Sequence, residues 1–122
     1  MPRITLLAAG FAATALLAST PAFAKFGAFA YDQGATKFGY SYNQDTQARA
    51  DADALKGCNS AGCKIVFRTG PRQCGALATG DKGKVWGGAR RGNKAAAELA
   101  ALQDCQKRFS GQCKIRGSEC NR

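Results

Sequence analysis

The feature that most constrains this chain is an internal repeat. The segment Cys74–Thr79 (CGALAT) follows the pattern of Phe26–Tyr31 (FGAFAY), which lies 48 residues earlier. The match continues without a gap to Phe38–Gly39 and Trp86–Gly87, and each copy later reaches the tripeptide Cys-Lys-Ile. The chain therefore consists of two tandem copies of a half-domain, and the second copy begins at Cys74.

The N-terminal residues predict a signal peptide. Arg3 precedes an apolar run from Ile4 to Leu17, and Ala22–Phe23–Ala24 fits the small-x-small pattern of a cleavage site. This run is short for a membrane span. We therefore expect cleavage after Ala24, no transmembrane segment in the mature chain, and a periplasmic or secreted location. The mature chain is then a single domain, residues 25–122, with repeats 25–73 and 74–122.

Residue patterns predict the same four elements in each copy. Alternation of aromatic and small residues is typical of strands, and Ala-rich segments that follow a capping residue are typical of helices. The predicted order is strand Phe26–Tyr31, strand Lys37–Tyr42, helix Thr46–Lys56, strand Cys63–Thr69, then strand Cys74–Thr79, strand Lys84–Ala89, helix Lys94–Phe109 and strand Gln112–Arg116. We predict an α+β domain with an antiparallel sheet, helices packed against it, and a pseudo-twofold axis between the halves.

The first helix carries two more specific expectations. Asp45 or Thr46 is suited to cap its N-terminus, because a short polar side chain accepts hydrogen bonds from free backbone N–H groups. Ala48, Ala52 and Leu55 fall on one helical stripe. The small side chains of this helix allow it to lie close to the sheet.

Six cysteines and no histidine set the chemistry. An even number of cysteines behind a secretion signal indicates three disulfides. The repeat predicts Cys58–Cys63 and Cys105–Cys113 at equivalent positions, and Cys74–Cys120 as the third pair. Chain-entropy arguments assign these loops about 2, 2.6 and 4 kcal/mol. A redox-active pair lacks the C-x-x-C motif. A zinc site made of cysteines is disfavoured because the Cys105-x7-Cys113 spacing is outside the usual ligand range.

The chain is basic, with a net charge of +10. Loss of Arg3 with the signal leaves +9, of which residues 25–73 carry +3 and residues 74–122 carry +6. Such a charge favours acidic partners, although it also favours solubility alone. The sharpest local feature is a five-charge cluster beside Trp86, formed by Lys82, Lys84, Arg90, Arg91 and Lys94. At the start of a helix, this cluster is suited to phosphate, sulfate or carboxylate; the alternative is a solvated loop.

Strand aromatics are the second candidate surface. Phe38 and Trp86 are expected in the core, as large apolar side chains usually are. Tyr40 and Tyr42 are expected to be more open, because their hydroxyls tolerate water. The alternative to a core role is that Tyr31, Phe38, Tyr40, Tyr42 and Trp86 form a set able to stack on a sugar or a base.

Four glycines recur at matched strand positions. They are Gly27, Gly39, Gly75 and Gly87. We expect them to make room for a packed aromatic ring or helix, with close approach of a ligand as the alternative.

These motifs together resemble a known family. The residues are the signal, F-G-A-F-A-Y from Phe26, F-G-Y-S-Y from Phe38, an Ala-rich helix ending at Cys58, Cys63–Lys64–Ile65–Val66, C-G-A-L-A from Cys74, V-W-G-G from Val85, and a second Ala-rich helix ending at Cys105. Over residues 26–120 the chain resembles the bacterial secreted family known as domain of unknown function 4189. The resemblance implies an exported, disulfide-containing domain and implies no catalytic residues. The segment Gly-Gly-Ala-Arg-Arg after Trp86 and the basic second half depart from the family pattern.

Residue types argue against catalysis. The chain has no histidine base, nucleophile elbow, phosphate loop or metal triad, and the eight acidic residues show no glycosidase-type pair. Our leading hypothesis is an exported, non-catalytic domain that binds a protein partner, as an inhibitor or an immunity-like factor does. The alternatives are a polyanion binder for nucleic acid, acidic glycan or anionic lipid, and a small hydrolase. We expect no cofactor and no metal, and a monomer or weak dimer.

Overall fold

A computed structural model of the chain describes residues 24–122. The predicted signal peptide therefore lies, except for Ala24, outside the described residues. The elements are β1 (Phe26–Asp32), β2 (Lys37–Gln44), α1 (Gln47–Cys58) and β3 (Lys64–Thr69), followed by β4 (Cys74–Gly80), the short 3₁₀ turn η1 (Asp81–Gly83), β5 (Val85–Arg91), α2 (Lys94–Gln106) and β6 (Lys114–Cys120). The predicted strand-strand-helix-strand order, repeated twice, is confirmed.

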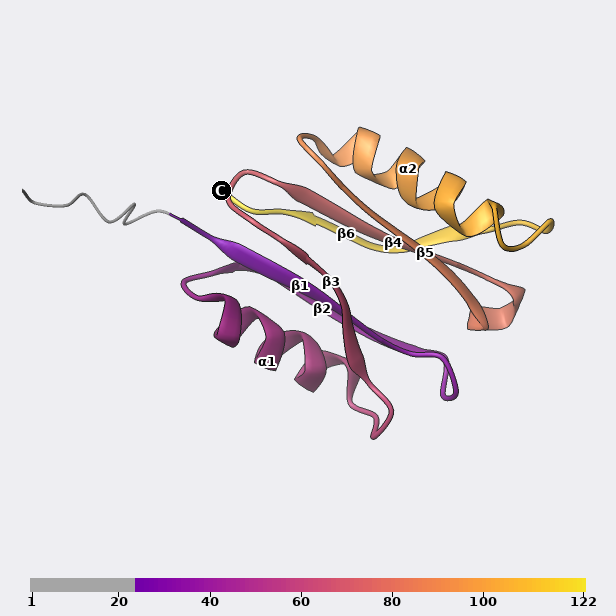
Figure 1. Cartoon of the computed structure of the whole chain (residues 1–122), viewed down its shortest axis with the longest axis horizontal. Coiled ribbons are helices and arrows are strands. Elements are labelled where there is room, and N and C mark those ends of the chain that lie inside the picture. Colours follow the sequence, from indigo (N-terminus) through magenta and orange to yellow (C-terminus); the bar gives the residue numbers. More distant parts are fainter. Residues whose placement is uncertain (1–23) are drawn as a thin grey trace, which may run out of the picture.

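Each repeat forms a three-stranded antiparallel sheet of its own. The strand orders are β2-β1-β3 and β5-β4-β6, so the first strand of each repeat is central. The two sheets stack face to face, with α1 on the outside of one and α2 on the outside of the other (Figure 1). The α+β class and the packing of helices on antiparallel strands are confirmed. The strands form two sheets rather than the one sheet expected, so that the domain has four layers.

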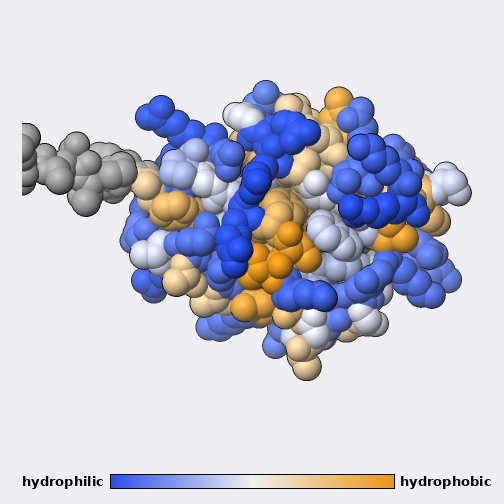
Figure 2. All heavy atoms as spheres, in the orientation of Figure 1, coloured by the Kyte–Doolittle hydropathy of each residue, from blue (hydrophilic) through white to orange (hydrophobic). Residues whose placement is uncertain are grey.

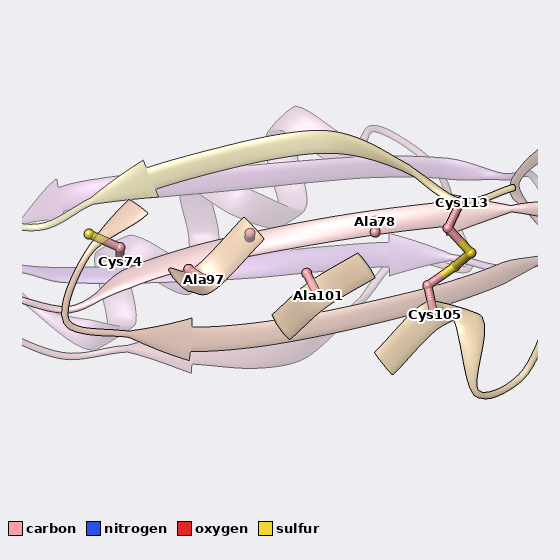
Figure 3. Close-up of a cluster of buried hydrophobic side chains, with 7 residues drawn as sticks. Cys74, Ala78, Ala97, Ala101, Cys105 and Cys113 are labelled. Carbon is pink, nitrogen blue, oxygen red and sulfur yellow. A yellow bond between two sulfur atoms is a disulfide. The ribbon is translucent and has the colours of Figure 1, made fainter. Parts of the chain in front are cut away.

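Small residues set the distance between each helix and its sheet. Ala97, Ala101 and Cys105, spaced four residues apart on one face of α2, are buried against β4, where they meet Ala78 (Figure 3). In α1, the equivalent stripe is Ala50, Ala54 and Cys58.

The stripe predicted for α1 was wrong. Ala48, Ala52 and Leu55 are exposed, and the next stripe along the helix is buried instead. An Ala-rich helix offers several stripes of small residues, and only the one that ends at Cys58 allows this side chain to reach its disulfide partner.

Two glycines explain how close the helices lie. A Cβ atom at Gly39 would sit 2.2 Å from the backbone N of Cys58, and one at Gly87 would sit 2.2 Å from the backbone N of Cys105. No side chain fits there without moving the helix. At Gly75, the space is filled by the ring of Phe29. The packing role expected for these glycines is confirmed at Gly39, Gly75 and Gly87. At Gly27 the neighbours are instead polar, because an added Cβ would lie 2.4 Å from the hydroxyl oxygen of Thr69 and 2.6 Å from the carbonyl oxygen of Ser41.

All three predicted disulfides are present: Cys58–Cys63, Cys105–Cys113 and Cys74–Cys120. The two short ones join a helix C-terminus to the strand that follows it. The third joins β4 to β6, where Cys74 and Cys120 are paired residues of the ladder.

Element ends differ modestly from the prediction. Thr46 caps α1 by accepting a hydrogen bond from the N–H of Arg49, and Asn93 caps α2 in the same way. The helix α2 ends at Gln106 rather than Phe109, and β6 runs to Cys120 rather than Arg116 because it pairs along the whole of β4.

Aromatic side chains fill the space between the two sheets. Across sheet β2-β1-β3, the paired residues Tyr40, Phe29 and Phe67 form a row of stacked rings. The equivalent row of sheet β5-β4-β6 is Gly88, Leu77 and Gly117. Each outer ring covers the opposite glycine: a Cβ at Gly88 would lie 2.4 Å from Phe67, and one at Gly117 would lie 2.8 Å from Tyr40. The two halves are therefore complementary, because the first contributes large aromatic residues where the second has glycines.

Candidate functional site

The structure divides the predicted basic cluster. Lys82 and Lys84 lie before β5, and Arg90 and Arg91 lie at its far end, opposite Gly75 and Cys74 in the ladder. A strand of seven residues spans about 20 Å, so these two pairs do not form one site. The prediction of a single five-charge cluster was wrong, because sequence proximity along a strand is not proximity in space.

The C-terminal end of β5 belongs to a groove of about 700 Å³. Edge strands β3 and β5, from different repeats, form its walls together with α2. Its lining residues are Val66, Phe67, Arg68, Trp86, Gly88, Ala89, Arg90, Arg91, Ala100, Gln103, Asp104 and Lys107. We call this surface the β3–β5 groove. Hydrophobic side chains gather over β3 near the middle of the face in Figure 2, and strongly hydrophilic ones surround them.

Four of the lining side chains are basic and one is acidic. Arg68 makes a two-pronged ion pair with Asp51 of α1, with N–O distances of 2.9 and 3.0 Å. Arg90 crosses between the sheets and donates to the carbonyl oxygen of Arg68 at 3.1 Å. Arg91 donates to the carbonyl oxygen of Arg90 in its own strand, and both Arg91 and Lys107 are exposed. The groove is therefore electropositive, and its outer cations remain accessible.

Side chains occupy the outward backbone groups of β5. Asp104 accepts from the N–H of Gly88 at 3.0 Å, Arg108 donates to the carbonyl of Trp86 at 2.7 Å, and Arg91 donates to the carbonyl of Arg90 at 2.7 Å. An edge strand treated in this way is protected from pairing with another strand. A ligand in the groove therefore meets side chains rather than a free strand edge.

Trp86 is the aromatic residue that the prediction and the groove share. Its ring is half-buried beside Tyr31, and the guanidinium of Arg108 lies 5.5 Å from its centroid. Phe38 is packed likewise against the core between the sheets, as expected.

The remaining predicted site residues lie elsewhere. Tyr40 and Tyr42 are on β2, at the opposite edge of their sheet from β3. Tyr42 is open, with 42% of its surface exposed, whereas Tyr40 is half-buried under the other half. Lys94 is exposed at the start of α2 and does not line the groove.

Sequence reasoning missed the part of the groove contributed by β3 and by the end of α2. Phe67, Arg68 and Lys107 belong to no binding motif that the sequence shows. The alternation of Val66, Phe67 and Arg68 indicated a strand with two usable faces, but nothing in the sequence indicated that this strand faces β5.

The carboxylates with altered pKa values are held in structural contacts. Hydrogen bonds from the hydroxyl of Ser60 and the N–H of Ala35 lower the pKa of Asp32. Arg68 lowers the pKa of Asp51. A lowered pKa makes these groups poor proton donors at neutral pH. Among residues 24–122, no group of three His, Cys, Asp or Glu side chains is arranged to hold a metal ion.

Comparison with known proteins decides the family. The model of a domain of unknown function, DUF4189, matches residues 26–120. The chain belongs to the DUF4189 family. This DUF4189 domain is 34% identical over 86 residues to Protein Rv1269c of Mycobacterium tuberculosis and to Protein Mb1300c of Mycobacterium bovis, a match that covers 70% of the chain and 62% of those relatives. The NMR structure of Rv1813c from Mycobacterium tuberculosis is similar, with a TM-score of 0.57 and 30% identity, covering 80% of this chain and 75% of that one.

The disulfides of this DUF4189 domain bear on its location. Three disulfides are typical of a domain outside the cytoplasm, where thiols are oxidised. None of the helices in residues 24–122 is both long and apolar enough to cross a membrane.

Proposed function

We propose that this protein is an exported, non-catalytic binding domain that takes an acidic segment of a protein partner into the β3–β5 groove. The observation that carries the proposal is the composition of the groove, four basic side chains and one acidic around the aromatic residues Phe67 and Trp86. Aromatic and arginine side chains dominate the energy of protein interfaces. Complementary charge steers an acidic partner toward such a surface.

The scaffold around the groove also supports binding. The ion pair of Arg68 with Asp51 fixes one wall to α1, and the hydrogen bond from Arg90 to Arg68 joins the two walls. A site that is already ordered loses little entropy when a ligand binds. This is the arrangement expected of an inhibitor or an immunity-like factor.

Affinity capture with matched variants tests the proposal. The groove variant is Arg91→Ala/Lys107→Ala, which removes two exposed charges. The control variant is Arg49→Ala/Lys56→Ala, which removes two exposed charges from α1. We expect the wild type and the control to retain one protein in stoichiometric amount at physiological salt, where exposed charges are only partly screened, and the groove variant to lose it. Equal retention by the groove variant would contradict the proposal.

A second candidate function is binding of a polyanion. It is favoured by the net charge of +6 on residues 74–122 and by exposed cations at both ends of β5. Binding of duplex DNA would then weaken with salt, with a log–log slope of about −0.9 per phosphate neutralised. Affinity independent of salt excludes this candidate. A polyanion also contacts several cations at once. Lys114→Ala, which lies away from the groove, should therefore lower the affinity for a polyanion as well.

Export and assembly complete the proposal. We infer cleavage after Ala24 and a periplasmic or extracellular destination, and N-terminal sequencing of the protein from its native compartment should begin at Lys25. An N-terminal residue other than Lys25 would contradict this cleavage site.

The proposed form is a monomer or weak dimer, for which sedimentation equilibrium should give the monomer mass at low concentration.

A further inference from the structure

The two hairpin turns of the molecule pack together at one end. Gln33, in the turn after β1, donates to the carbonyl of Lys84, in the turn after β4, at 2.8 Å. Gly83 lies against Thr36, where an added Cβ would come within 2.8 Å of the threonine Cβ. Residues of both repeats therefore meet here and form one wall of a second pocket.

This second pocket has a volume of about 340 Å³ and lies between the hairpin turns and β6. We call it the turn pocket. Its polar lining includes Thr36, Thr79, Lys82, Gln112, Lys114 and Arg116. Its volume is at the lower end of the range for small-molecule sites, so a small group fits and a polymer does not.

The turn pocket has a surplus of positive charge. Lys82, Lys114 and Arg116 line it with a single carboxylate, Asp81. Three ion pairs are present in the part of the chain that the structure describes, and none of them includes any of these three cations. Like charges that line one pocket repel one another, and an anion between them would remove the repulsion.

Arg116 is held in place at this site. Its guanidinium lies over the ring of Phe38, 5.3 Å from the centroid. Stacking on a ring leaves the edge of the guanidinium free, where its donors match two oxygens of one anion. The hydroxyls of Thr36 and Thr79 and the amide of Gln112 add neutral donors around it.

A buried hydroxyl next to this region lacks a partner. Tyr31 pairs with Phe38 across β1 and β2, and its hydroxyl is buried without a hydrogen bond. Burial raises its pKa, and the charge of Arg116 opposes this effect. The hydroxyl therefore stays protonated at neutral pH. An unmade hydrogen bond in such a place is costly.

We propose that the turn pocket binds a phosphate or sulfate group, with Arg116, Lys114 and Lys82 as its charged ligands. A tetrahedral oxyanion offers oxygens in several directions, which suits cations that come from β6 and from the turn before β5. A single carboxylate has two oxygens and leaves one cation without a partner. This site is separate from the β3–β5 groove and does not rest on the function proposed for it.

Titration of the oxidised protein with inorganic phosphate and with sulfate, at constant ionic strength, tests the site. We expect saturable chemical-shift changes in the turn pocket. Arg116→Gln and Lys114→Gln should each weaken binding at least about tenfold, as loss of a charged hydrogen bond does. Lys56→Gln on the exposed face of α1 is the matched control and should leave affinity unchanged.

Two results would overturn the proposal. One is a linear, unsaturated response to both anions, which indicates an adventitious ion only. The other is equal weakening by Lys56→Gln, which indicates net charge alone. Arg116→Gln removes a contact with Phe38 and can therefore reduce stability. Lys114→Gln tests the same pocket without removing that contact.

A further pair of probes separates the sources of the group. Glycerol phosphate that competes with inorganic phosphate, without co-sedimentation of the protein on phosphatidylglycerol vesicles, indicates a soluble ester. Co-sedimentation that Arg116→Gln abolishes and Lys56→Gln retains indicates a lipid headgroup. Both outcomes support the oxyanion site.

Discussion

Single glycines decide how the residues of this domain can pack. Gly39 and Gly87 lie where a Cβ would be 2.2 Å from the backbone of a helix, and backbone atoms cannot turn aside as a side chain does. We predict that Gly39→Ala and Gly87→Ala each lower the free energy of unfolding by about 1–3 kcal/mol or more, as overpacking does. Denaturant unfolding of the oxidised protein measures this.

The matched control for these glycines is Gly92, which has no atom within 4 Å of an added Cβ. Gly92→Ala should change stability by no more than about 1 kcal/mol. Equal losses at Gly92 and Gly87 would contradict the helix-contact explanation, because the lower entropy of the unfolded chain after Gly→Ala stabilises the folded state.

At the scale of elements, one helix–strand tie depends on pH. The guanidinium of Arg68 lowers the pKa of Asp51, so the ionised form is favoured by folding. Its stabilisation is complete above the ordinary aspartate pKa of about 4 and is lost as the pH falls through the lower folded pKa. We predict that Arg68→Ala destabilises the domain at pH 7 and that the difference from wild type shrinks toward pH 2. If the difference in unfolding free energy between wild type and Arg68→Ala did not change with pH, the Arg68–Asp51 ion pair would not be its cause. Lys56→Ala, which removes an exposed charge from α1, is the control.

The disulfides rank by the length of chain they close. Cys74 and Cys120 are separated by 46 residues, whereas Cys58 and Cys63 are separated by 5. Replacing the long-range pair by serine should therefore cost about 4 kcal/mol, against about 2 kcal/mol for the short pair. Thermal unfolding of the two double variants gives the order. A larger loss for Cys58→Ser/Cys63→Ser would show that anchoring of the helix end outweighs loop entropy.

At the scale of the whole molecule, the two halves fit because they are not alike. Phe67 covers Gly88, and Tyr40 covers Gly117. We predict that Gly88→Ala destabilises by about 1–3 kcal/mol. Phe67→Ala in the same chain should relieve part of this, with a coupling of at least about 0.5 kcal/mol in a double-mutant cycle. Additive losses would mean that the ring does not occupy the space above Gly88.

Much of this architecture follows from the repeat, and the rest depends on how the halves face each other. Matching positions predicted the element order and the two short disulfides, because equivalent cysteines occupy equivalent places. The third disulfide followed as the pair that remained. The buried stripe of α1 was not predictable from spacing alone, since alanines occur on several faces. The β3–β5 groove joins Phe67 and Trp86 from different repeats. Their proximity arises only when the sheets stack, and no local pattern reports it.

The most direct test of the proposed function is a chemical-shift map of the oxidised, ¹⁵N-labelled protein titrated with the partner recovered by capture. The groove account predicts changes that centre on Phe67, Trp86 and Arg91, together with the end of α2, and that disappear in Arg91→Ala/Lys107→Ala. Changes confined to α1 or to the edge formed by β2 and β6 would contradict it.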